Sequence, residues 1–267
     1  MPFGPTLNLA DLDGSNGFVI KGIDVSDQSG FSVSSAGDVN GDGVDDLIIS
    51  ANLADPNGNV SAGESYVVFG QSGGFSSSLE LSALDGSNGF IINGIDANDN
   101  SGYSVSSAGD VNGDGVDDLI IGANLAAPNG NVSAGESYVV FGQSGGFSSS
   151  LELSALDGSN GFVINGIDAN DNSGFSVSSA GDVNGDGVDD LIISAPAAAP
   201  NGNSAAGESY VVFGQSGGFS NSLELSALDG SNGFVINGID AGDISGFSVS
   251  SAGDVNGDGV DDLIISA

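Results

Sequence analysis

An acidic motif of nine residues occurs four times in this chain, at intervals of 72 residues. It reads DVNGDGVDD and begins at Asp38, Asp110, Asp182 and Asp254. Four carboxylates within nine positions repel one another, and the 267-residue chain has one Lys, no Arg and no His that could neutralise them. Either the motif binds a cation from solution, or it forms a solvated acidic turn.

The spacing of the oxygen atoms favours a cation. Side-chain oxygens fall at positions 1, 3, 5 and 9, Gly at position 6 permits a sharp turn, and Val at position 7 can offer its backbone carbonyl, as in oxygen-ligand calcium loops. Such flexible oxygen ligands favour Ca²⁺ over Mg²⁺, and the His and Cys that zinc or copper would prefer are absent. We therefore expect about four Ca²⁺ ions per chain, one in each loop. The expected ligands are Asp38, Asn40, Asp42, Val44, Asp46, Asp110, Asn112, Asp114, Val116, Asp118, Asp182, Asn184, Asp186, Val188, Asp190, Asp254, Asn256, Asp258, Val260 and Asp262.

Two alternatives to this kind of calcium loop can be weighed. An EF-hand needs Glu at position 12, where the second copy has Ile121, and a helix where a strand is expected. A turn that binds nothing would explain a single Asn-Gly-Asp-Gly, but it explains less well three ligand carboxylates, Asn and Gly between two apolar strands. Asp117, at position 8 of the second copy, is expected to point outward to solvent and not to be a ligand. We expect the calcium to be purely structural.

The elements that position these loops repeat with the same period. Residues 75–146 and 147–218 align without gaps and differ at only seven positions, which indicates a recent duplication. No stretch has a sustained helical period, and short β-branched and aromatic runs alternate with turns rich in Gly, Asn, Asp, Ser and Pro. The strands expected in the second unit are 102–109, 118–123, 136–142 and 161–167.

Four antiparallel strands per repeat, apolar enough to be covered on both faces, are typical of a β-propeller blade. The main rival is a calcium-loaded parallel β-helix with nine-residue repeats, but its G-G-x-G-x-D pattern is missing. We predict an all-β fold, a β-propeller of 72-residue four-stranded antiparallel blades that forms an incomplete ring of about 3.7 repeats. The single partial propeller over 1–267 comprises an outer strand of an incomplete blade in 1–30, blades at 31–102, 103–174 and 175–246, and a truncated blade at 247–267.

The motif, followed by DLIISAP (190–196) and then by GESYVVFG (207–214), resembles the FG-GAP repeat. That repeat is the blade unit of the propeller in integrin α chains and in many bacterial surface or secreted proteins. The resemblance covers the whole chain, with Ser194-Ala195-Pro196 in place of G-A-P and Phe175-Ser176 in place of F-G. It implies the same calcium ligands, and it implies that the face opposite the calcium loops binds a protein or glycan partner.

Composition excludes several classes of protein. The formal charge of −35 opposes binding to nucleic acid, whose phosphates require Lys or Arg. No apolar run approaches a membrane span, so membrane insertion is not expected. The first residues have neither the basic nor the apolar region of a secretory signal peptide. We nevertheless expect an extracellular or cell-surface location, because loops that bind calcium weakly are filled only where calcium is abundant. We expect the chain to reach that location by another route or as part of a longer secreted protein.

Enzymatic function is not expected, because the usual nucleophiles and bases are missing and Lys21 is the only cationic side chain. The six Glu residues could form carboxylate pairs for glycoside hydrolysis, but a pair repeated in every blade is better explained as solvated charges at strand edges. These residues are Glu64, Glu136 and Glu208 in one set and Glu80, Glu152 and Glu224 in the other. We expect an adhesion or interaction module. The alternatives are a catalytic or non-catalytic domain of a secreted carbohydrate-active enzyme, or a surface-array protein.

Overall fold

The computed structural model describes residues 6–267 and is built almost entirely from β-strands. The first five residues of the predicted segment 1–30 lie outside the described part of the chain. No helix within residues 6–267 has the length and the apolar character needed to cross a membrane. The short 3₁₀ turns are η1 (Leu9–Asp11), η2 (Pro56–Gly58), η3 (Leu81–Ala83), η4 (Pro128–Gly130), η5 (Leu153–Ala155), η6 (Pro200–Gly202) and η7 (Leu225–Ala227).

Three repeats each form a sheet of four antiparallel strands, as predicted. The first consists of β2 (Val33–Gly37), β3 (Asp46–Ala51), β4 (Glu64–Val68) and β6 (Gly89–Asn93). The second consists of β7 (Ser104–Gly109), β8 (Asp118–Ala123), β9 (Glu136–Val140) and β11 (Gly161–Asn165). The third consists of β12 (Val177–Gly181), β13 (Asp190–Ala195), β14 (Glu208–Val212) and β16 (Gly233–Asn237).

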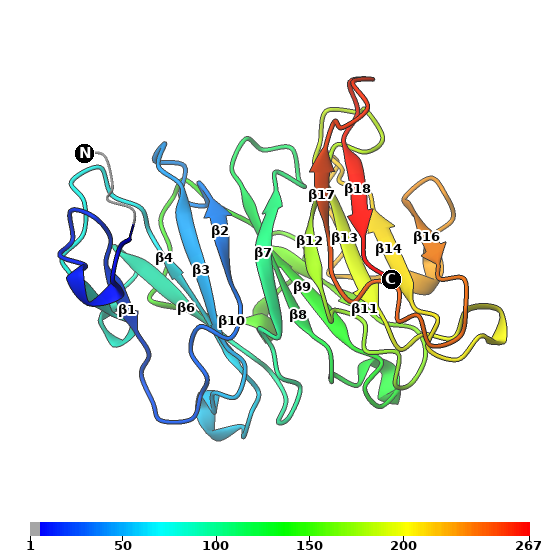
Figure 1. Cartoon of the computed structure of the whole chain (residues 1–267), viewed down its shortest axis with the longest axis horizontal. Helices are drawn as coiled ribbons and strands as arrows, with labels where there is room; N and C mark the ends of the chain where they lie inside the picture. Colours follow the sequence, from blue (N-terminus) through cyan, green and yellow to red (C-terminus); the bar gives the residue numbers. More distant parts are fainter. Residues whose placement is uncertain (1–5) are drawn as a thin grey trace.

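The sheets stand side by side as blades in an open arc (Figure 1). The first strands β2, β7 and β12 contact one another in turn, and β12 contacts β17 (Val249–Gly253), which pairs with β18 (Asp262–Ile265). At the other end lies β1 (Val19–Lys21). Within residues 6–267 the sheets do not close into a ring, which confirms the prediction of an incomplete propeller.

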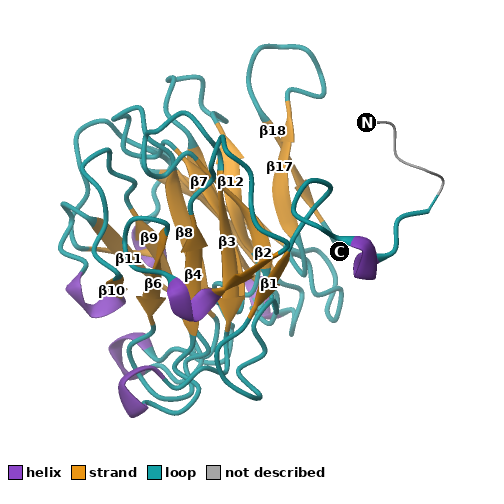
Figure 2. Cartoon of the chain, turned by 90° about the vertical axis from the view of Figure 1, so that its left-hand side faces the viewer, coloured by secondary structure: helices purple, strands orange, loops and turns teal. Residues whose placement is uncertain are grey.

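The apolar core lies between neighbouring blades. One cluster joins Ile48 and Phe90 of the first blade to Leu119 and Tyr138 of the second, and all six residues of β8 are buried. The continuous apolar run DLIIGA of β8 is therefore covered on both faces, because the second blade packs between the first and the third. Viewed after a 90° turn, the strands run between two ends of the molecule at which the loops gather (Figure 2).

In two of the three sheets, a fifth, short strand from the next repeat adds to the four predicted antiparallel strands. Strand β10 (Ser150–Glu152) pairs in parallel with β6 of the preceding blade, and β15 (Ser222–Glu224) pairs likewise with β11. Strand β5 (Ser78–Glu80) pairs with β1. These strands lie in a segment that the sequence indicates only as a Ser- and Gly-rich connection, since three residues without apolar alternation carry no strand signal. We call residues 74–81, 146–153 and 218–225 the straps.

Candidate metal-binding loops

The four acidic motifs form the loops of the hairpins between the first two strands of each blade. The hairpin loops lie along one edge of the arc, at the top of Figure 1. In the second blade the hairpin pairs Gly109 with Asp118, after a register shift between Ser107 and Gly109. The bulge and the hairpin bring positions 1 and 9 of the motif together at the ends of two neighbouring strands.

Side-chain oxygens hold the backbone of each loop in a tight curl. In the second loop, both Asp110 Oδ1 and Asn112 Oδ1 accept a hydrogen bond from the Asp114 amide, each at 2.9 Å. Asp110 Oδ2 accepts one from the Gly115 amide at 2.8 Å, and Asp114 Oδ1 accepts one from the Val116 amide at 3.0 Å. Gly115, at position 6, has a φ of +89°, a conformation that favours glycine. The oxygens at positions 1, 3 and 5 thus line the curl.

The carboxylate at position 9 is buried at the base of the curl. Asp118 has no exposed surface, and it accepts hydrogen bonds from the Val111 amide at 3.0 Å and from the Gly142 amide at 2.9 Å. Burial, the largest cause, raises the pKa of Asp118 to about 8, and the carboxylates of Asp114 and Asp110 add to the shift. Burial therefore disfavours the ionised form of Asp118.

The structure brings some of the expected ligands together more closely than others. Asn112 Nδ2 lies 3.4 Å from Asp118 Oδ1, so positions 3 and 9 are in contact, and position 1 shares the Asp114 amide with position 3. Within residues 6–267, however, no group of three acidic side chains is close enough to hold a metal ion by itself. A bound ion would therefore also need the Asn side chain and backbone oxygen, which are the donors that Ca²⁺ accepts. The donor set fits calcium.

The same pattern recurs in the other three loops. The amide at position 5 bonds to the oxygens at positions 1 and 3 in each of them, and the amide at position 6 bonds to position 1. Asp46 and Asp190, at position 9, are fully buried, and burial raises the pKa of each to about 6. In the fourth loop Asp254 is exposed and Asp262 is half-buried.

Position 8 of the motif has a role that the sequence does not indicate. Asp117 does not point outward to solvent: its Oδ2 accepts a hydrogen bond from the amide of Asp38 in the preceding loop, at 2.8 Å. Asp189 and Asp261 bind the preceding loops in the same way, at 2.9 and 3.0 Å. The contact is close, because a Cβ atom on Gly109 would lie 2.2 Å from Asp189 Oδ2. Each loop is thus joined to the next through the residue at position 1 of its motif.

We expect Asp117→Ala to destabilise the protein, because the half-buried Asp38 amide then loses its acceptor, at a cost of about 1–2 kcal/mol. The melting temperature should fall by about 3–6 °C in a circular-dichroism melt. Asp45→Ala is the matched control, since Asp45 occupies the same motif position but is exposed. Equal effects of the two substitutions would contradict a role between blades, and Asp117→Asn, which keeps an acceptor oxygen, should restore most of the loss.

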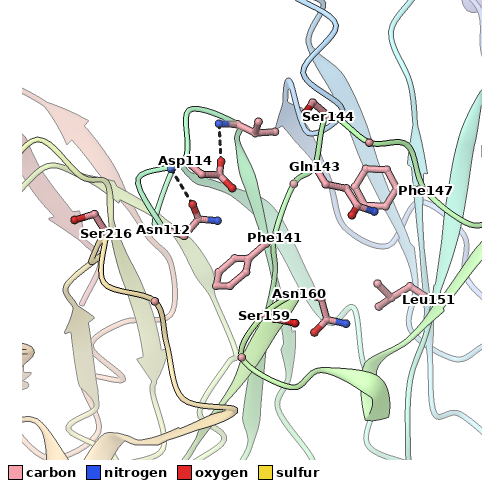
Figure 3. Close-up of a pocket in the computed structure, with 15 residues that line it drawn as sticks. Asn112, Asp114, Phe141, Gln143, Ser144, Phe147, Leu151, Ser159, Asn160 and Ser216 are labelled. Atoms are coloured by element: carbon pink, nitrogen blue, oxygen red, sulfur yellow. Dashed lines mark hydrogen bonds between the residues drawn. The ribbon is translucent and has the colours of Figure 1, made fainter.

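A pocket of about 660 Å³ lies beside the second loop (Figure 3). Its lining includes Asn112 and Asp114 from the loop, Phe141 from the end of β9, and Phe147 and Leu151 from the strap. The described residues that line it include a single carboxylate and no His, Lys or Glu. The carboxylate pair that glycoside hydrolysis uses is therefore not formed there.

The face opposite the acidic hairpin loops carries a second, repeated set of acidic side chains. Burial raises the pKa of Asp99 to about 7, with further contributions from Glu136 and Asp96. Burial also raises the pKa of Glu136, which accepts a hydrogen bond from the Tyr138 hydroxyl. The Asn98 amide, in the connection that follows β6, donates a hydrogen bond at 2.8 Å to the carbonyl of Val60 in the loop between β3 and β4, so these two loops of the first blade meet on this face.

Glu80 is exposed, as expected of a solvated edge charge, but the other five Glu residues are half-buried, which corrects the expectation for them. Glu136 is half-buried, and Glu152 of the strap accepts hydrogen bonds from Asn93 Nδ2 at 2.6 Å and from Asn57 Nδ2 at 3.0 Å. Both Asn side chains belong to the preceding blade. The sequence could not show this, because the partners lie 59 and 95 residues away.

Comparison with known proteins identifies the repeat. The FG-GAP repeat model matches residues 29–68, 101–140 and 173–212, so the chain contains three FG-GAP repeats and the resemblance in the sequence is confirmed. The chain is 30% identical over 250 residues to "Integrin alpha pat-2" from Caenorhabditis elegans, a match that covers 90% of this chain. It is 33% identical over 172 residues, 62% of the chain, to "Integrin alpha-5" from Xenopus laevis.

A third relative is an enzyme by name. "Phosphatidylinositol-glycan-specific phospholipase D" from Bos taurus is 32% identical over 178 residues, 67% of this chain. The chain spans only 18%, 14% and 20% of the lengths of these three relatives, respectively. The similarity therefore describes the repeats, which are of the integrin α type, and it covers a small part of each relative.

Proposed function

We propose that this chain is a calcium-stabilised β-propeller module that binds a protein or glycan partner outside the cell. The observation that carries the calcium proposal is the fully buried carboxylate at position 9, seen in Asp46, Asp118 and Asp190. A buried carboxylate is costly without a cation. The one ion pair among residues 6–267 joins Lys21 to Glu80, at 2.7 Å, which leaves no basic side chain for these sites.

In each loop the ion would be held by the side chains at positions 1, 3, 5 and 9 and by the backbone at position 7. Bound Ca²⁺ would supply positive charge, and each ion would offset two of the 35 net negative charges. The residues of the loop itself set the shape of its backbone: Asp110 and Asn112 accept hydrogen bonds from the Asp114 amide, and Gly115 allows the chain to turn. The role is structural, because the loops join the two innermost strands of each blade.

The interaction role is supported by the integrin α type of the repeats and by the absence of an acid–base pair in the pocket beside the second loop. We place the partner on the face opposite the calcium loops, and the location outside the cell follows from the weak affinity expected of exposed hairpin loops. The similarity to a phospholipase D supports a second candidate function, namely that of a non-catalytic domain of a secreted enzyme. Catalysis by this chain is not proposed.

Calorimetric titration with Ca²⁺ tests the calcium proposal. We expect about four ions per chain, with dissociation constants of roughly 10⁻⁴–10⁻³ M, the class of extracellular calcium modules. Mg²⁺ at the same concentrations should bind more weakly, since the curled loop does not offer rigid octahedral geometry. No binding at 10 mM calcium would refute the proposal.

A further inference from the structure

Adjacent hairpin loops exchange hydrogen bonds between position 1 of one loop and position 8 of the next. The Asp110 amide donates to Asp189 Oδ2 at 2.9 Å, and the Asp189 amide donates to the Asp110 carbonyl at 3.3 Å. Asp182 and Asp261 exchange the equivalent two bonds, at 3.0 and 3.2 Å. The residue at position 8 thus holds both the amide and the carbonyl of the residue at position 1 in the preceding loop.

A second set of hydrogen bonds links the buried position-9 carboxylates of the first two loops. The Gly142 amide, after β9, donates to Asp118 Oδ1 at 2.9 Å. The amide of the next residue, Gln143, donates to the Val39 carbonyl in the first loop at 2.9 Å. The Val39 amide donates to Asp46 Oδ2 at 3.2 Å. The segment after β9 therefore contacts position 9 of its own loop and position 2 of the preceding loop.

The second and third loops are linked in the same way. The Gly214 amide donates to Asp190 Oδ1 at 2.9 Å, and the Gln215 amide donates to the Val111 carbonyl at 2.9 Å. A Cβ atom on Gly214 would lie 2.2 Å from the Asp189 carbonyl oxygen and 2.9 Å from that of Val111. The segment after β14 is therefore packed tightly between the two loops, and neither loop can shift without it.

We propose that Asp117, Asp189 and Asp261 are positioning residues for calcium in the preceding loop, and that adjacent loops therefore fill with positive cooperativity. Position 8 lies between the expected ligands at positions 7 and 9, so an ion that fixes those two also fixes the position-8 residue. The position-8 side chain in turn holds the amide of the expected ligand at position 1 in the preceding loop. This coupling rests on the proposed function, since it requires that the loops bind calcium.

Shared ordering of the backbone is the physical reason for positive cooperativity. When one loop is filled, these hydrogen bonds restrict its neighbour, so that binding there costs less conformational entropy. By linkage, each loop favours the other by the same factor. Repulsion between bound ions opposes this effect, but salt at about 0.15 M screens exposed charges more than about 8 Å apart, whereas interactions between partly buried groups are screened much less.

Equilibrium dialysis measures this cooperativity as the number of calcium ions bound per chain at each free calcium concentration. For the unaltered chain we expect a Hill coefficient of about 1.5 or more. The triple variant Asp117→Ala, Asp189→Ala and Asp261→Ala keeps every expected ligand, and its Hill coefficient should fall to about 1. The matched control replaces the same three residues by Asn, which keeps the acceptor oxygen, and it should retain the cooperativity. A Hill coefficient of 1 in the unaltered chain, or equal cooperativity in the Ala variant, would overturn the coupling.

A second test leaves every position-8 residue in place and does not depend on the folding of the triple variant. Asp114→Ala removes one of the proposed ligands of the second loop, at an exposed position. With that loop empty, the remaining loops should bind calcium about threefold more weakly, or weaker still. Independent loops would keep their affinity, and loops coupled only by repulsion between ions would bind more tightly, so either result would overturn the coupling while calcium still binds. A chain that binds no calcium would refute the proposed function itself, and the coupling with it.

Discussion

Removal of calcium should lower the melting temperature of this protein by about 20 °C or more. An ion that binds only the native state stabilises it by RT ln(1 + [L]/Kd), which is about 2.7 kcal/mol at a hundredfold excess over Kd. Four such loops would together contribute about 11 kcal/mol in 10 mM calcium, if each Kd is about 10⁻⁴ M. The measurement is a circular-dichroism melt in 10 mM calcium and in excess EDTA.

The ion itself must be responsible for this shift. Adding back calcium beyond the chelator should restore the melting temperature, whereas an equal concentration of Mg²⁺ should restore little of it. A change in ionic strength alone should not reproduce the effect, so sodium chloride of matched ionic strength is the second control. Equal melting temperatures in calcium and in EDTA would show that the loops hold their curl without an ion.

The second large effect is expected for Asp118→Ala. This substitution removes one of the proposed calcium ligands, and it also leaves the buried amides of Val111 and Gly142 without an acceptor. Each unsatisfied amide costs about 1–3 kcal/mol. We therefore expect the melting temperature to fall by roughly 10 °C in calcium, with part of the loss persisting in EDTA.

Asp114→Ala separates the two contributions. Asp114 is exposed and bonds one amide within its own loop, which water can reach after the substitution. The substitution Asp114→Ala should lower the melting temperature in calcium and should change the melting temperature little in EDTA. If Asp118→Ala and Asp114→Ala behaved alike in EDTA, the buried position-9 carboxylate would have no structural role apart from the ion.

The sequence alone determines the repeat, the blade and the loops. The period of 72 residues, the continuous apolar run DLIIGA and the β-branched run in ESYVV are local signals, and the strands form where these signals occur. The curl of the second loop is also local, because every bond from Asp110 and Asn112 to the Asp114 and Gly115 amides spans five residues or fewer. The chain folds on itself over these distances whatever lies next to it.

Only the tertiary structure decides the contacts between blades. The strap strand Ser150–Glu152 has no strand signal of its own and pairs because β6 of the preceding blade offers an open edge. Asp117 reaches the Asp38 amide, 79 residues away, because adjacent hairpin loops lie side by side in the arc. Asp45 has the same local sequence as Asp117 but remains exposed. Identical sequence gives different environments here, because the neighbouring blade, not the residue, supplies the partner.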